Sequence, residues 1–123
     1  MNKNIKILIV DDDLDIILSF KNGLESNGFE VDSYNDPILA LKNFKANIYD
    51  LLLIDIRMPN MTGFELYQKI SKIDNKAEVC FITAFEVYYR ALLEEFPDLD
   101  QKCFIQKPIS IDELVKRIQK ELN

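Results

Sequence analysis

The sequence predicts an α/β domain built on a doubly wound, five-stranded parallel sheet with helices on both faces. Apolar runs of strand length alternate five times with segments of helical spacing, which is typical of a parallel sheet covered on both sides. With 123 residues, 48% of them hydrophobic, the chain has room for one domain core and not for two. Residues 1–123 are therefore predicted to form a single domain.

The five apolar runs give the expected strands. In chain order they are Ile5–Val10, Phe29–Tyr34, Leu51–Ile54, Val79–Thr83 and Cys103–Ile105. The first and third runs are the most apolar, which indicates central strands, whereas residues 29–34 alternate apolar and polar side chains as an edge strand does. With the strand order 2-1-3-4-5, the ligand-binding crevice of such a sheet lies beyond the carboxyl ends of the first and third strands.

Local signals mark the ends of the expected helices. Residues 14–24 carry leucine and isoleucine at helical spacing, and Gly28 stands where that helix should stop. The pair Asp36–Pro37 is typical of an N-cap followed by the first helical residue. The capping-box spacing, Ser or Thr followed three residues later by Glu, occurs at Thr62–Glu65 and Ser110–Glu113.

Composition excludes several classes of function. The formal charge of −6, with no local cluster of Lys and Arg, opposes binding to nucleic acid or to an anionic membrane. No apolar stretch approaches the roughly 20 residues that span a bilayer, and the first apolar run is too short for a signal peptide. We therefore expect a cytoplasmic protein that binds neither nucleic acid nor membrane.

Cysteine and histidine usage restricts the chemistry further. Cys80 and Cys103 lie inside apolar runs rather than in a metal-ligand spacing, which predicts buried free thiols. Histidine is absent, which removes histidine-based triads, histidine general bases and most transition-metal sites. Oxygen ligands and hard cations remain as the plausible metal chemistry.

Acidic residues end two of the expected strands. Asp11 and Asp12 follow the first apolar run and Asp55 follows the third, so the three carboxylates are expected to meet at one edge of the sheet. Like charges crowded together call for a cation. Thr83 closes the fourth run and Lys107 follows the fifth, so both should reach the same edge. A site that combines three carboxylates, a hydroxyl and a lysine is suited to a metal ion and a phosphoryl group.

Each of these residues also has a simpler structural explanation. An Asp after a strand is often a helix N-cap, which we predict for Asp13 and which is as plausible as a metal site for Asp11 or Asp12 taken alone. Thr83 suits a strand, and a lysine such as Lys107 is usually solvated. Capping does not explain a threonine and a lysine at the other strand ends, so the combination favours a functional site.

Four segments in this order, ILIVDD, LLLIDIRMPNMTGFEL, FITA and QKP, strongly resemble the receiver domains of two-component response regulators, including the chemotaxis receivers. The resemblance covers essentially the whole chain. It implies a flavodoxin-like three-layer sandwich that accepts a phosphoryl group from the phosphohistidine of a histidine kinase or phosphotransfer protein. It further implies a protein-binding surface, switched by phosphorylation, for a downstream effector. Such a domain catalyses only its own phosphorylation and dephosphorylation and is not otherwise an enzyme.

The resemblance also implies roles for individual residues. Asp55 would be the phosphoacceptor. Asp11, Asp12, Asp55 and the backbone carbonyl of Arg57 would hold Mg²⁺, with Mn²⁺ as a substitute. Thr83 and Lys107 would bind the phosphoryl group.

Further roles concern switching and the lifetime of the phosphorylated state. Thr83 and Phe104 would form the switch, and Lys107 would precede a cis peptide bond to proline. Arg57 and Phe85 stand where receivers tune the lifetime, and we expect the Phe85 side chain to shield the phosphoryl group from water. Homodimerisation through the fourth helix and the fifth strand is expected by analogy with the family.

Two other functions stay open at this stage. The segment VDDD contains D-x-D after an apolar strand, as in small phosphatases of the haloacid dehalogenase type, with Asp11 as nucleophile and Asp13 as acid. Against it, Asp15 stands where that family has Thr or Val. A receiver-like fold kept only for protein binding would show no effect of Mg²⁺. A flavodoxin fits less well, because acidic residues after the first strand would repel a flavin phosphate.

Overall fold

The structure, a computed structural model, describes residues 4–84, 93–95, 97 and 102–123. Its strands are β1 (Lys6–Val10), β2 (Glu30–Tyr34), β3 (Leu51–Asp55), β4 (Glu78–Thr83) and β5 (Cys103–Gln106). Its helices are α1 (Leu14–Ser26), α2 (Pro37–Asn43), α3 (Gly63–Ser71) and α5 (Ile111–Leu122). All strand pairs are parallel, and the sheet order is β2-β1-β3-β4-β5. The predicted fold class and strand order are confirmed.

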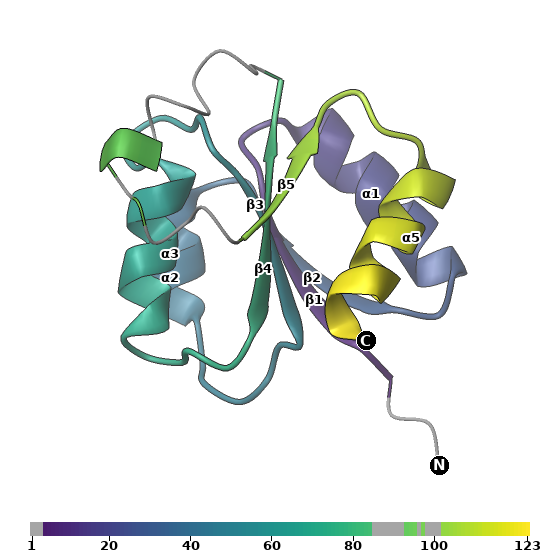
Figure 1. The fold of residues 1–123 in the computed structure, drawn as a ribbon, viewed down its shortest axis with the longest axis horizontal. Helices are drawn as coiled ribbons and strands as arrows, with labels where there is room; N and C mark the ends of the chain where they lie inside the picture. Colours follow the sequence, from purple (N-terminus) through teal and green to yellow (C-terminus); the bar gives the residue numbers. More distant parts are fainter. Residues whose placement is uncertain (1–3, 85–92, 96, 98–101) are drawn as a thin grey trace.

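The sheet separates two layers of helices (Figure 1). Helices α1 and α5 pack on one face, over a core that includes Ile7 and Ile9 of β1, whereas α2 and α3 pack on the other face with Leu8 and Val10. Successive side chains of a strand point to opposite faces, so a continuous apolar run such as β1 serves both cores. Each fully buried Leu or Ile contributes roughly 1.5–3 kcal/mol to stability.

The strand boundaries differ from the prediction by single residues. Phe29 precedes β2 because its N–H donates to the Leu24 carbonyl at the end of α1, and pairing with β1 begins at Glu30. Asp55 belongs to β3 and pairs in register with Ile82 of β4. All of β3 is buried, whereas β2 is an edge strand with partly exposed residues. The predicted distinction between central and edge strands is confirmed.

The helix ends follow the predicted caps. The Asp13 side chain accepts hydrogen bonds from the N–H groups at the start of α1, and Gly28, at φ 92°, ends that segment in a conformation that favours glycine. Asp36 caps α2, and Thr62 forms a complete capping box with Glu65. At Ser110 the structure shows half of the box, since its hydroxyl accepts from the Glu113 N–H.

Two helical leucines do not contribute to the core. Leu14 and Leu18 lie one turn apart on α1, and each is 57% exposed, whereas Ile17 and Leu24 of the same helix are buried. The helical spacing that predicted α1 therefore includes an outward-facing apolar pair.

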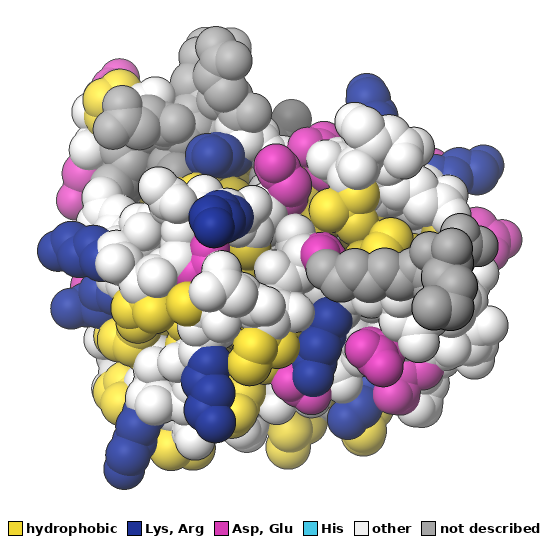
Figure 2. Space-filling view, turned by 90° about the horizontal axis from the view of Figure 1, so that it is seen from below, with side chains coloured by type: hydrophobic (Ala, Val, Ile, Leu, Met, Phe, Trp, Pro, Cys, Tyr) yellow, Lys and Arg dark blue, Asp and Glu magenta, His cyan; other side chains and the backbone are white. Residues whose placement is uncertain are grey.

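The molecular surface carries charges of both signs. Figure 2 views the end of the molecule where β3 and β4 begin, and there Lys and Arg side chains are interspersed with Asp and Glu rather than gathered into one basic patch. Among the described residues, no helix has the length and apolar character needed to cross a membrane.

Candidate functional site

The carboxyl ends of four adjacent strands bring the predicted site residues to one edge of the sheet. Asp11 directly follows β1, Asp55 ends β3, Thr83 ends β4 and Lys107 directly follows β5. In-register pairing between Val10 and Ile54, and between neighbours along β4 and β5, keeps these ends level. The residues lie up to 96 positions apart in the chain, and the parallel sheet brings them together.

The three carboxylates form a compact acidic cluster. One oxygen from each of Asp11, Asp12 and Asp55 lies within 4.8 Å of the others. Asp11 and Asp55 are 1% and 6% exposed, while Asp12 is open to solvent. Ligands on opposite sides of an octahedral Mg²⁺ are about 4.2 Å apart, given metal–oxygen distances of about 2.1 Å. Small side-chain rotations therefore suffice for these oxygens to share one Mg²⁺, and an exposed third carboxylate leaves room for the waters that this ion retains.

Lys107 is the positive charge within this cluster. Its ammonium Nζ donates to Asp11 Oδ2 at 2.8 Å and lies 3.7 Å from Asp55 Oδ1. The lysine backbone N–H donates to the Thr83 carbonyl at 2.8 Å, which fixes the residue beside the end of β4. The following peptide bond to Pro108 is cis, as predicted. The Lys107 side chain is only 14% exposed, and its shorter contact is with Asp11 rather than with Asp55.

Burial and the neighbouring charge of Asp11 raise the pKa of the Asp55 carboxyl from 3.8 to about 7, against the opposing effect of Lys107. Asp12 adds to the rise through a hydrogen bond and through its charge. Buried carboxylates in mutual contact resist full ionisation. The cluster without a bound cation therefore tends to hold a proton on Asp55, and a divalent cation would replace that proton.

Gly63, at the start of α3, packs directly against the backbone of Asp55. A Cβ built at this position would overlap the Asp55 carbonyl oxygen and would lie 3.0 Å from Ile54 Cγ2. The Gly63 N–H also donates to the Ile56 carbonyl at 2.9 Å, and the Ile56 N–H donates to the Ile82 carbonyl at 3.0 Å. The glycine is needed for close approach of α3 to the end of β3, rather than for a turn.

We expect Gly63→Ala to weaken Mg²⁺ binding by about tenfold or more, because the added methyl group must displace the backbone that carries Asp55. Gly23→Ala is the matched control, since its Cβ would meet the Ile111 side chain at 2.5 Å, between α1 and α5 and away from the acidic cluster. Isothermal titration calorimetry measures the Mg²⁺ affinity of each variant. Equal affinities in the two variants would show that Gly63 does not position Asp55.

The structure describes some of the remaining predicted site residues and not others. Thr83 is 7% exposed at the end of β4, and Arg57 is exposed in the loop after β3. Phe104 is half-buried on the α3 side of the sheet, with its ring centroid 5.5 Å from that of Phe81 and 6.1 Å from that of Phe64. Phe85 and most of the predicted fourth helix lie outside the described residues, so shielding by Phe85 and dimerisation through that helix stay predictions.

An apolar surface beside the site was missed at the sequence level. Leu14 and Leu18 are exposed on α1, and the same helix borders a hollow of about 270 Å³ lined by Phe20, Pro108 and Ile109. The available signal was the presence of leucines on more than one face of α1. Periodicity alone does not identify which face packs against the sheet.

Comparison with known proteins assigns almost the whole chain to one family. Residues 7–119 match the response regulator receiver domain family. The chemotaxis protein CheY of Bacillus subtilis is 32% identical over 119 residues, which is 96% of this chain and 98% of that protein. The transcriptional regulatory protein RprY of Bacteroides fragilis is 30% identical over 97% of this chain and 50% of its own length. The chain thus spans about half the length of several transcriptional regulators that it matches.

Solved structures give the same result. The non-phosphorylated receiver domain of HemR from Leptospira biflexa is 28% identical, with a TM-score of 0.84 over 98% of this chain and 95% of that one. The response regulator TrrA from Thermotoga maritima, in complex with Mg²⁺-BeF, is 31% identical, with a TM-score of 0.81 over 96% of this chain and 99% of that one. The chain belongs to the response regulator receiver domain family.

Proposed function

We propose that this receiver domain is a phosphoacceptor of a two-component system, with Asp55 as the residue that is phosphorylated. The observation that carries the proposal is the position of the Asp55 carboxylate, which is buried beside Asp11 and lies 3.7 Å from the Lys107 ammonium at the carboxyl edge of the sheet. The domain turns over no ordinary substrate and catalyses only its own phosphorylation and dephosphorylation.

In the proposed reaction, an oxygen of Asp55 attacks the phosphorus of a phosphohistidine on a partner protein. The P–N bond breaks, a P–O bond forms to give an acyl phosphate, and the imidazole leaves with the partner and takes up a proton. Once a bound cation has replaced the proton on Asp55, the carboxylate nucleophile has no proton to lose, so the absence of histidine in this chain is no obstacle. Such transfers depend mainly on positioning and on charge neutralisation.

Several residues around Asp55 would together neutralise the negative charge of the phosphoryl group. Lys107 would pair with one phosphoryl oxygen, and the Thr83 hydroxyl would donate to another. Asp11, Asp12, Asp55 and the Arg57 carbonyl would hold Mg²⁺ or, in its place, Mn²⁺. When bound, the ion would supply positive charge to both the carboxylates and the phosphoryl oxygens. The compact carboxylate cluster supports this assignment, as does the similarity to TrrA, which was solved with Mg²⁺-BeF.

Mg²⁺ should raise the thermal stability of the chain, because it binds a cluster that exists in the folded state. At a concentration 100 times the Kd the gain is about 2.7 kcal/mol. Asp12→Asn should lose most of this gain. Asp13→Asn should keep it, because Asp13 caps α1 through hydrogen bonds to Asp15 and Ile16.

Thermal unfolding of both variants at increasing Mg²⁺ concentrations makes the comparison. If the Asp12 and Asp13 variants respond equally, the ion binds elsewhere and the proposed ligand set is wrong.

The partners we propose are a histidine kinase or phosphotransfer protein that donates the phosphoryl group, and an effector protein that responds to it. The exposed pair Leu14 and Leu18, on the helix that begins beside Asp11 and Asp12, is a suitable contact for the donor. Phosphorylation would draw Thr83 and Lys107 toward Asp55 and shift the packing of Phe104, which changes the effector surface. Cytoplasmic location and homodimerisation stay predictions, and the formal charge of −6 disfavours a nucleic-acid partner.

The position of Asp13 argues against the alternative function as a phosphatase of the haloacid dehalogenase type. Asp13 would have to protonate a leaving group, but its side chain accepts two backbone hydrogen bonds as the N-cap of α1. The Asp13 side chain is thus engaged at the start of α1, as an N-cap is.

Incubation with acetyl phosphate and Mg²⁺ tests the proposed function. We expect the intact mass to rise by one phosphoryl group and the label to disappear when Mg²⁺ is removed with EDTA. A chain that takes up no phosphoryl group under these conditions would contradict the proposed function, and a chain that also shows no effect of Mg²⁺ on its stability would instead be a receiver-like protein-binding module.

A further inference from the structure

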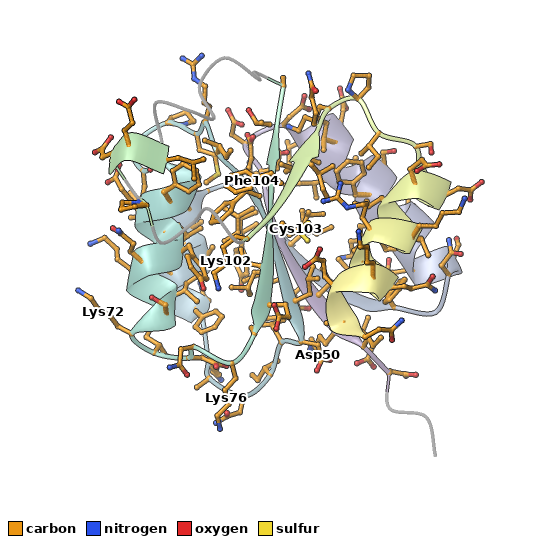
Figure 3. All side chains as sticks on the ribbon, viewed as in Figure 1. Asp50, Lys72, Lys76, Lys102, Cys103 and Phe104 are labelled. Carbon is orange, nitrogen blue, oxygen red and sulfur yellow. The ribbon has the colours of Figure 1, made fainter. Side chains whose placement is uncertain are left out.

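The two cysteines face each other across the last two strands of the sheet. Cys80 of β4 and Cys103 of β5 are register partners, and both are free thiols in the core between the sheet and the α1 and α5 helices. Cys103 is the first residue of β5 and stands between Lys102 and Phe104 (Figure 3). Neither thiol has a part in the proposed phosphoryl transfer.

An arginine points at one of these thiols. Arg117 of α5 donates from Nη2 to Cys103 Sγ at 3.2 Å and to the Phe104 carbonyl at 3.1 Å. A guanidinium beside a sulfur stabilises the thiolate, and a thiolate is the nucleophilic form of cysteine. Of the two thiols, Cys103 is thus the one in an activating environment.

The two thiols also differ in proton affinity. The hydrogen bond with Cys80 lowers the pKa of the Cys103 thiol, and the charge of Arg117 lowers it further, while burial opposes both. The same hydrogen bond, followed by burial, raises the pKa of the Cys80 thiol well above its ordinary value. The pair is therefore asymmetric, because the Cys103 thiol loses its proton more easily than the Cys80 thiol does.

We propose that Cys80 and Cys103 form a hydroperoxide-reactive dithiol, in which Cys103 is the nucleophile and Cys80 closes a disulfide between β4 and β5. The Cys103 thiolate attacks one peroxide oxygen, the O–O bond breaks, and Cys103 becomes a sulfenic acid while hydroxide leaves. Cys80 gives its proton to that hydroxide, and its sulfur then attacks Cys103 and expels a second hydroxide, which takes up the proton that Cys103 first lost. The two sulfurs lose two electrons in total, and hydrogen peroxide becomes two waters.

The geometry requires only a small closure. Neighbouring strands lie about 4.8 Å apart, whereas the Cβ atoms of a disulfide are about 3.8 Å apart. The strands must therefore approach by roughly 1 Å at this pair. Among the described strands, β5 lies at the edge of the sheet and pairs with β4 alone. Cys103 is 5% exposed and stands at the first position of that edge strand.

To test the proposal, the native, reduced protein is treated with millimolar hydrogen peroxide, and its intact mass is then measured. We expect the loss of two hydrogen masses, reversal by dithiothreitol, and a proteolytic fragment in which the two cysteine peptides are linked. Cys103→Ala should abolish the reaction. Cys80→Ala should stop it at the sulfenic acid, which dimedone traps as an adduct on Cys103.

Removal of the guanidinium tests the proposed activation. Arg117→Met should slow disulfide formation by about tenfold, whereas Lys116→Met, which removes the neighbouring and well-exposed charge on the same helix, should leave the rate unchanged. The proposal is overturned if both thiols stay reduced in the folded wild type but oxidise in urea, or if the two helix variants react equally fast. These readouts concern thiols alone, so they are separate from the outcome of the phosphorylation experiments.

Discussion

Asp55→Asn should abolish phosphorylation of the chain by acetyl phosphate. The substitution keeps the size of the side chain but removes the anionic oxygen that would attack phosphorus, and none of the other site residues occupies the same buried position beside Asp11 and Lys107. Rate losses on removing a nucleophile reach several orders of magnitude. The expected result is no mass increase over a period in which the wild type is fully labelled.

Asp50→Asn is a matched control for this experiment. Its carboxylate accepts a hydrogen bond from the Lys6 N–H at 2.9 Å, which an amide oxygen can also accept, and it lies at the end of the sheet opposite the acidic cluster (Figure 3). The control should be labelled at the wild-type rate. Undiminished labelling of the Asp55 variant would place the phosphoacceptor elsewhere and would overturn the proposed role of Asp55.

The stability of the metal-free chain should fall as the pH rises from about 5 to about 7. The folded state raises the pKa of Asp55 from 3.8 to about 7, so across this range the folded chain holds a proton that the unfolded chain has released. Unfolding free energy decreases with pH wherever the folded state binds more protons. Since each tenfold change in proton affinity is worth about 1.4 kcal/mol, the expected loss is on the order of 2 to 4 kcal/mol.

This pH range reports on Asp55 with little interference. The chain has no histidine, the side chain that ordinarily titrates there. Asp74, whose pKa is lowered by the N–H groups of Asn47 and Lys76, contributes at lower pH and with the opposite sign, since its stabilisation is lost in acid. Urea unfolding at several pH values, with EDTA present, measures the effect. Asp55→Asn should flatten the profile, and Mg²⁺ should restore stability at the alkaline end. A profile that stays steep in the variant would assign the titration to another group.

The sequence determined the fold because its signals are local. Continuous apolar runs of strand length indicate β1 and β3, since strands buried on both faces carry such runs, and the caps at Asp13 and Thr62 are formed within a few residues. The presence of the acids and Lys107 at one edge follows from parallel topology alone. For these features a pattern of residue types was sufficient.

Other features depend on contacts between distant segments, which a pattern does not encode. Nothing in the sequence distinguishes the exposed Leu18 from the buried Ile17. The need for glycine at position 63 arises from the closeness of Asp55, and the pairing of Lys107 with Asp11 depends on side-chain reach. Such details require the packed structure.

The pairing of Lys107 with Asp11 has a consequence for how ligands would act together. The Lys107 ammonium group acts as an internal counterion of Asp11. A divalent cation that binds the same Asp11 oxygen therefore has to compete with the Lys107 charge. This internal competitor lowers the observed affinity for the cation. Its displacement releases a positive charge within 3.7 Å of Asp55, where a phosphoryl group would be attached. Occupancy by the cation and attachment of the phosphoryl group are then thermodynamically linked, and by reciprocity each favours the other.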